Sequence, residues 1–107
     1  MKKFKLKYNN KEIEVYPHID KYCLGDSLAI VLIMADTHEP FVNLTVNLPT
    51  QLKNWKLGFE YQYVDVNNFP GAIEFILDNK LGELTRYSGM SGYCIYPVVK
   101  FDLGAFI

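Results

Sequence analysis

Five residues of this chain could hold a metal ion: His18, Asp20, Cys23, His38 and Cys94. Zinc sites usually draw two neighbouring ligands from one turn, as in C-x2-C or H-x3-H pairs. His18 and Cys23 are five positions apart, and no second pair accompanies them. We therefore expect loop histidines and a buried thiol, with both cysteines reduced, no bound metal and no cofactor.

The serines at Ser88 and Ser91 are the candidate nucleophiles, in the segment SGMSG. They lack the spacing of a strained nucleophile elbow, and both histidines lie within the first 38 residues. Neither G-x-G-x-x-G nor G-x-x-x-x-G-K-[ST] occurs, so no phosphate-binding loop is indicated. We expect a protein that is not an enzyme and has no catalytic residues.

A row of lysines opens the chain, and it allows two interpretations. Lys3, Lys5 and Lys7 are the nucleic-acid-binding candidates, because a basic row beside aromatic residues can follow a phosphate backbone. Lysines along an end strand also protect a sheet against edge-to-edge aggregation. Arg86 is the only arginine, and outside residues 1–11 six bases face twelve acids. The protective interpretation is therefore favoured, and the nucleic-acid interpretation stays open.

Aromatic residues gather in the second half, where tyrosine and tryptophan can anchor a protein interface. A tyrosine-rich sheet is the alternative explanation. A small-ligand pocket near Asn67, Asn68 and Arg86 is a third possibility. The protein-binding candidates are Trp55, Tyr61, Tyr63, Asp65, Glu74, Asp78, Arg86, Tyr87 and Tyr93.

Composition limits the class of protein. The 107 residues fit one domain, 1–107, and 50% of them are hydrophobic, which is enough for a core. The net charge of −1 provides no overall field for nucleic acid or an anionic membrane. No apolar run approaches the roughly 20 residues of a membrane span, and no signal-peptide pattern follows the basic start. We expect a cytoplasmic protein, either a monomer or a homodimer.

Periodicity predicts the elements of the first half. Residues 3–16 alternate as a hairpin turning at Asn9-Asn10, with Pro17 closing it and 18–25 as a connection. The apolar run 27–35 predicts a strand covered on both faces, paired with an alternating strand over 41–48. Residues 50–58 are expected to form an exposed loop.

The second half is expected to hold one more strand, a helix and a last strand. The strand covers 59–66 and the helix about 69–81, capped by Asn67 or Asn68 and stopped by Gly82. A turn at 88–92 precedes a strand over 93–101, which Pro97 makes an edge strand or a bulged one. The predicted class is α+β: one antiparallel sheet of five to six strands with a helix packed on it, in the order β-β-β-β-β-α-β.

Three segments together resemble the domain of unknown function 4313 family: LAIVLIMADTHEPFVNLTVNLP at 28–49, YVDVNNFPGAIEFI at 63–76, and the stretch from LG to CIYP ending at residue 97. The resemblance brings no catalytic or binding residues. It implies a setting in Gram-positive bacteria, their phages and mobile elements. We therefore expect a non-enzymatic protein that inhibits a host defence complex, as an anti-CRISPR does, by protein–protein contact.

Overall fold

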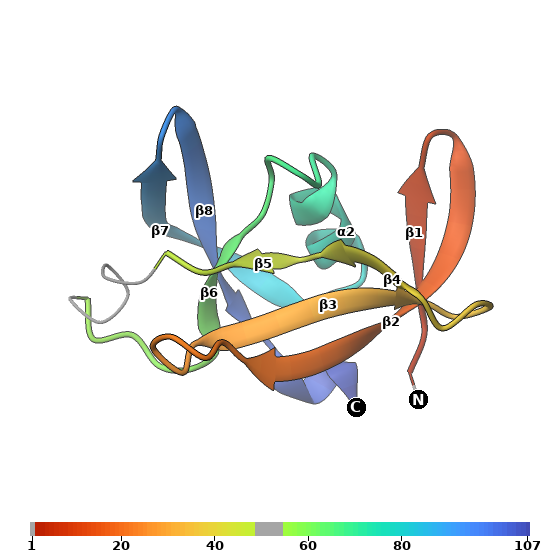
Figure 1. Ribbon diagram of the computed structural model, residues 1–107, viewed down its shortest axis with the longest axis horizontal. Helices are drawn as coiled ribbons and strands as arrows, with labels where there is room; N and C mark the ends of the chain where they lie inside the picture. Colours follow the sequence, from red (N-terminus) through yellow and green to blue (C-terminus); the bar gives the residue numbers. More distant parts are fainter. Residues whose placement is uncertain (1, 49–54) are drawn as a thin grey trace.

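The computed structural model describes residues 2–48 and 55–107 as two four-stranded antiparallel sheets with one described α-helix (Figure 1). The α+β class is confirmed, but the expected single sheet is wrong. Sheet A has the order β1-β2-β3-β4, made of β1 (Phe4–Tyr8), β2 (Lys11–Lys21), β3 (Leu28–Met34) and β4 (Pro40–Asn43). Sheet B has the order β5-β6-β8-β7, made of β5 (Thr45–Val46), β6 (Tyr61–Val64), β8 (Cys94–Phe101) and β7 (Gly82–Ser91).

The first hairpin forms as predicted, and its second strand is longer than predicted. Asn9 and Asn10 both take positive φ, 50° and 62°, in a two-residue turn that pairs Tyr8 with Lys11. Pro17 does not close the unit, because β2 continues through it to Lys21. Pairing with β1 ends at Val15, so no strand on that side requires the N–H that proline lacks. The expected connection therefore begins only after Lys21.

The predicted strand over 41–48 divides at Leu44 between the two sheets. The Leu44 N–H donates to the Ile30 carbonyl of sheet A at 2.9 Å, and the Leu44 carbonyl accepts from the Asp65 N–H at 3.0 Å, next to β6. β3 pairs with β4 as predicted, but it is not covered on both faces. Only alternate residues of it are buried: Leu28, Ile30 and Leu32.

Buried polar side chains join the sheets at the same place. The Thr45 hydroxyl accepts from the Ile30 N–H at 3.0 Å and lies 2.9 Å from the Tyr22 hydroxyl. The Gln62 amide, fully buried on β6, donates to the Leu28 carbonyl at 2.7 Å. We call Tyr22, Leu44, Thr45 and Gln62 the seam, because they hold sheet A to sheet B.

The helix α2 (Ala72–Asp78) is shorter than the predicted 69–81, and neither predicted end is correct. Gly71, not an asparagine, precedes it, without a side-chain cap. At the other end Lys80 takes the left-handed conformation, with φ 55°. Its N–H bonds the Leu77 carbonyl and the Leu81 N–H bonds the Ile76 carbonyl, which is a Schellman motif.

Gly82 has a different role from the predicted helix stop, because it begins β7, a strand that the sequence analysis missed. A Cβ at Gly82 would lie 2.7 Å from the Lys100 carbonyl oxygen and 2.8 Å from Val99 Cγ1. Glycine is therefore needed for close approach to β8. β8 starts at Cys94, and its Pro97 pairs with Ser88 next to an irregularity in β7 between Leu84 and Ser88.

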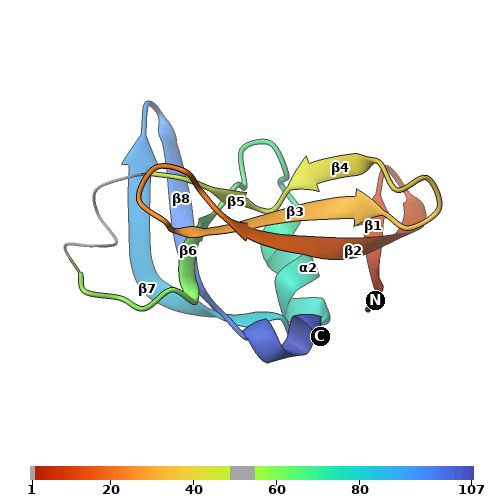
Figure 2. The ribbon, with the colours of Figure 1, turned by 60° about the horizontal axis from the view of Figure 1, so that its bottom comes forward.

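Two groups of buried side chains fill the molecule. The larger group lies between sheet A, α2 and the short 3-10 helix η1 (Leu103–Phe106), and Figure 2 shows α2 crossing the strands of sheet A. The Phe4 and Phe106 rings, 6.1 Å apart, hold the two ends of the chain near each other. The smaller group is centred on Tyr63, Tyr96 and Val98 of sheet B. No helix in the described ranges is long and apolar enough to cross a membrane.

Replacing Gly82 should test the close approach of β7 to β8. We expect Gly82→Ala to lower the free energy of unfolding by about 1–3 kcal/mol, because the new methyl group meets the Lys100 backbone. Gly71→Ala is the matched control, since its Cβ would meet only the Phe69 ring, at 3.6 Å. Urea unfolding measures both variants, and equal stabilities would contradict the assignment.

Candidate protein-binding surface

The end of the β7–β8 hairpin, residues 87–97, projects from the body of the molecule, and we call it the arm (Figure 1). It contains no charged residue, since Arg86 and Lys100 are the nearest charges in the sequence. Three large apolar side chains on it are exposed: Met90 at 64%, Tyr93 fully and Ile95 at 58%. Exposed apolar side chains gathered in one place mark a contact surface more often than scattered ones do.

The local sequence explains why these side chains face solvent. Ser91 pairs with Cys94, so Gly92 and Tyr93 form a two-residue turn, with Gly92 at φ 61°. Met90 pairs directly with Ile95, which places both side chains on one face of the hairpin. The turn lifts Tyr93 to the end of the arm.

The opposite face of the arm packs on Tyr63 of β6, in the same sheet. A Cβ at Gly89 would collide with the Tyr63 ring, so glycine lets the hairpin lie on that ring. Tyr96, opposite Gly89, is buried beside Tyr63 and Val98. The arm is thus fixed at its base while its Met90 and Ile95 face is open.

Four of the predicted protein-binding residues come together where the arm begins: Trp55, Tyr61, Tyr63 and Tyr87. The Trp55 and Tyr87 rings lie 4.9 Å apart at 33°, and both pack on the group that contains the fully buried Tyr63. Tyr61 lies on the same strand as Tyr63, and the Lys100 ammonium is 6.0 Å from its ring. Tyr93, also predicted, lies at the end of the arm.

Arg86 is held at the base of the arm. Its guanidinium lies 5.4 Å from the centre of the Tyr87 ring. A hydrogen bond to Tyr87, and the charge interaction with it, raise the pKa of Arg86. Among the described residues no carboxylate forms a salt bridge with Arg86. It is therefore an exposed cation at the base of the arm that a partner can approach.

The acidic candidates lie elsewhere. Asp65 is only 5% exposed, and its carboxylate accepts from the Asn68 N–H at 3.2 Å and the Asn68 side-chain amide at 3.0 Å. It organises the turn before α2 and does not form a contact surface. Glu74 and Asp78 are exposed on α2, where they line a shallow hollow with Lys5 and Lys7 of β1.

The lysine row of β1 lies opposite glutamates of β2. Lys5 pairs with Glu14 and Lys7 with Glu12, and the Lys5 ammonium is 3.6 Å from the Glu12 carboxylate. The side-chain amide of Asn79 donates to the Lys5 carbonyl at 3.3 Å. The two glutamates reduce the positive charge that Lys5 and Lys7 present to a nucleic acid. The arrangement agrees with a protected edge.

The residues considered as metal ligands are dispersed. His18 Nε2 lies 3.7 Å from the Asp20 carboxylate, and His38 Nδ1 is 3.1 Å from the Tyr16 hydroxyl. Cys23 is exposed and Cys94 is half-buried, so neither cysteine is the fully buried thiol that was expected. Within residues 2–48 and 55–107 no group of three or more His, Cys, Asp or Glu could hold a metal ion.

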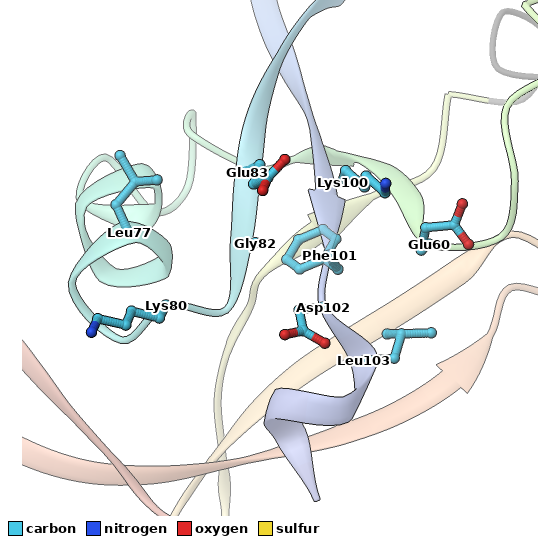
Figure 3. A pocket seen from close by; sticks show the side chains of 9 residues that line it. All are labelled: Glu60, Leu77, Lys80, Gly82, Glu83, Lys100, Phe101, Asp102 and Leu103. Atoms are coloured by element: carbon cyan, nitrogen blue, oxygen red, sulfur yellow. The ribbon is translucent and has the colours of Figure 1, made fainter.

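A hollow of about 760 Å³ lies at the other end of β7 and β8 from the arm. Figure 3 shows Leu77 and Lys80 on one side of it and Lys100 and Glu60 on the other. Its lining mixes three acids with two lysines and includes none of Asn67, Asn68 and Arg86. The hollow therefore differs from the small-ligand pocket that the sequence predicted.

Met90 and Ile95 are the surface residues that sequence reasoning missed. The signal that could have found them is the pair Gly92-Tyr93 between two alternating segments, the pattern of a two-residue hairpin. The predicted turn over 88–92 hid it, because the serines and glycines there suggested a loop. The structure places most of that segment in β7.

Two buried phenols, Tyr63 and Tyr96, and the half-buried phenol of Tyr22 lie near the seam and the base of the arm. Burial raises the pKa of Tyr63 and of Tyr22; for Tyr22, the Thr45 hydrogen bond lowers the pKa and the Asp65 charge raises it. Burial raises the pKa of Tyr96 too; Cys94 and Asp65 add to this rise, and a hydrogen bond with Asn67 opposes it. These phenols remain neutral to higher pH in the folded chain than in the unfolded chain.

Comparison with protein families gives one match. A family model described as domain of unknown function (DUF4313) matches residues 17–106. The matched range contains the seam, α2 and the whole arm, and begins after the lysine row of β1. Comparisons with curated proteins and with solved structures give no match.

The buried phenols predict a loss of stability at alkaline pH. Because the pKa of each phenol in the folded chain is raised above its ordinary value of 10.0, the unfolded chain loses phenolic protons first, and stability falls as pH rises through the folded pKa. Tyr22→Phe removes one such group, so its unfolding free energy should fall less steeply between about pH 9 and 11. At neutral pH the variant should be less stable by about 1 kcal/mol, because the bond to Thr45 is lost.

Denaturant unfolding across this pH range measures the effect. Tyr93→Phe is the control for losing one exposed phenol. If the Tyr22→Phe and Tyr93→Phe proteins lose stability with the same slope, the role given to burial at Tyr22 is wrong.

Proposed function

This chain belongs to the DUF4313 family, and we propose that it is a non-enzymatic protein-binding protein whose contact surface is the arm. The observation that carries the proposal is the set of exposed side chains Met90, Tyr93 and Ile95 on the uncharged arm. The centre of a protein interface is depleted of charged residues and enriched in tyrosine and methionine. The arm has this composition.

The arm is suited to insertion into a groove of a partner. Its base is fixed on Tyr63, so little conformational entropy is lost on binding. Tyr93 at the end supplies a large ring with a hydroxyl, the kind of side chain that dominates binding energy. Met90 and Ile95 form an apolar face behind it. We infer an apolar groove on the partner, with carboxylates at the rim that meets Arg86.

The partner that we propose is a host protein, and the setting that the family resemblance implies makes it a component of a defence nuclease complex of a bacterium infected by a phage or mobile element. The chain would inhibit by occupying a surface, since contact alone is sufficient for that effect. Nucleic acid bound by the lysine row and a small ligand are the other candidates. Nucleic-acid binding would weaken steeply with salt, whereas contact through an uncharged arm would change little.

The test is capture of a partner from host lysate by the immobilised chain, after nuclease treatment and at two salt concentrations. We expect one stoichiometric protein, retained at the higher salt. Tyr93→Ala and Ile95→Ala should each lower its affinity about tenfold to a hundredfold, which corresponds to hot-spot energies of about 1.4–2.8 kcal/mol.

Leu24→Ala is the matched control, because Leu24 is 72% exposed in the turn between β2 and β3 and is not on the arm. A partner that binds all three variants equally would remove the arm from the mechanism. Retention that disappears with nuclease or with salt would support the lysine row and nucleic acid instead.

A further inference from the structure

Each sheet ends in strands with a free side, and three of the four terminal strands are protected. Lys5 and Lys7 lie on β1 and Lys3 directly precedes it. The side-chain amide of Asn79 donates to the Lys5 carbonyl of this strand. β4 is four residues long and begins with Pro40, and β5 has only two residues. β7 is ten residues long; its charges, Glu83 and Arg86, and its irregularity precede Ser88, so its last four residues, Ser88 to Ser91, contain no charge, no proline and no irregularity. Unprotected edges of this kind are templates for pairing with another chain.

The regular part of β7, Ser88 to Ser91, has backbone groups that point away from its own sheet. The two-residue turn makes Ser91 and Cys94 a hydrogen-bonded pair, and such pairs alternate with non-bonded ones. Gly89 therefore bonds to β8, while the N–H and C=O of Ser88 and Met90 face outward. Pro97, which lacks an N–H, lies opposite Ser88, as this phase requires. No described strand accepts these outward groups.

We propose that this edge pairs antiparallel with the same edge of a second copy, around a two-fold axis at Gly89. Ser88 of each copy then lies opposite Met90 of the other. Both residues have their backbone groups directed at the partner, so the two pairs exchange their N–H···O bonds in full. The registration is self-complementary, which a two-fold interface needs.

Charge and size agree with a second copy as the occupant. In this registration Arg86 faces Gly92 of the other copy, so no like charges meet. Ser88, Gly89 and Ser91 are small, and two backbones can approach. The net charge of −1 gives little repulsion between copies. Pairing would join the two sheets B and set two Met90–Ile95 faces side by side. This dimer does not depend on the proposed function.

Sedimentation equilibrium over a wide range of protein concentration tests the dimer. The mass should rise from 12.4 kDa toward double that value, with a dissociation constant in about the micromolar to millimolar range expected for a small interface. Met90→Pro removes an outward N–H, and we expect dimerisation at least about tenfold weaker, because each dimer loses two hydrogen bonds. Met90→Ala keeps that N–H and should still form the dimer.

Ser88→Lys provides a second variant in case Met90→Pro does not fold, since it gives β7 the lysine protection that β1 has. It should sediment as a single chain at concentrations where the wild type dimerises. The proposal is overturned if the wild type remains at 12.4 kDa at the highest concentration, or if Ser88→Lys dimerises as tightly as the wild type. Ser88→Lys leaves Met90, Tyr93 and Ile95 unchanged, so this variant separates dimerisation from partner binding.

Discussion

The passage of the chain from sheet A to sheet B at Leu44 is the constraint on which the rest of the structure depends. The Leu44 N–H donates to β3, and the Leu44 carbonyl accepts from the residue after β6, so the two sheets have a fixed relation there. Thr45 and Gln62 add buried side-chain bonds to β3 backbone groups at the same place. An unpaired polar group in this position would cost about 1–3 kcal/mol, so the seam strongly favours one arrangement of the sheets.

The seam also determines where the candidate surface lies. β6 carries Gln62 toward the seam and Tyr63 toward the smaller buried group, since neighbouring side chains of a strand face opposite ways. Tyr63 then supports the base of the arm through Gly89. Among the described strands, β7 is the long terminal strand without lysine or proline. β6 thus links the join between the sheets to the exposed Met90 and Ile95.

Sequence reasoning identified the elements whose signals are local. The Asn9-Asn10 turn, the apolar strand at 28–34 and the existence of one helix all follow from short-range patterns. The division at Leu44 has no such signal, because alternation continues through it while the partner strand changes. Lys80 in the left-handed position violates the preference for glycine, and tertiary packing decides the helix end there. Trp55, Tyr61, Tyr63 and Tyr87 could be named as candidates from residue type alone, whereas Met90 and Ile95 required the registration of a strand that was not predicted.

Met90 and Ile95 pair outside the two buried groups, so the sequence can change at these positions without changing the core. These side chains contact each other and solvent, so replacing them removes little packing from the buried groups and few bonds from the seam. Selection could change the shape and polarity of the arm by substitution while the sheets stay in register. The molecule therefore separates the residues that determine folding from those that we propose for recognition, which would let one scaffold follow a changing partner.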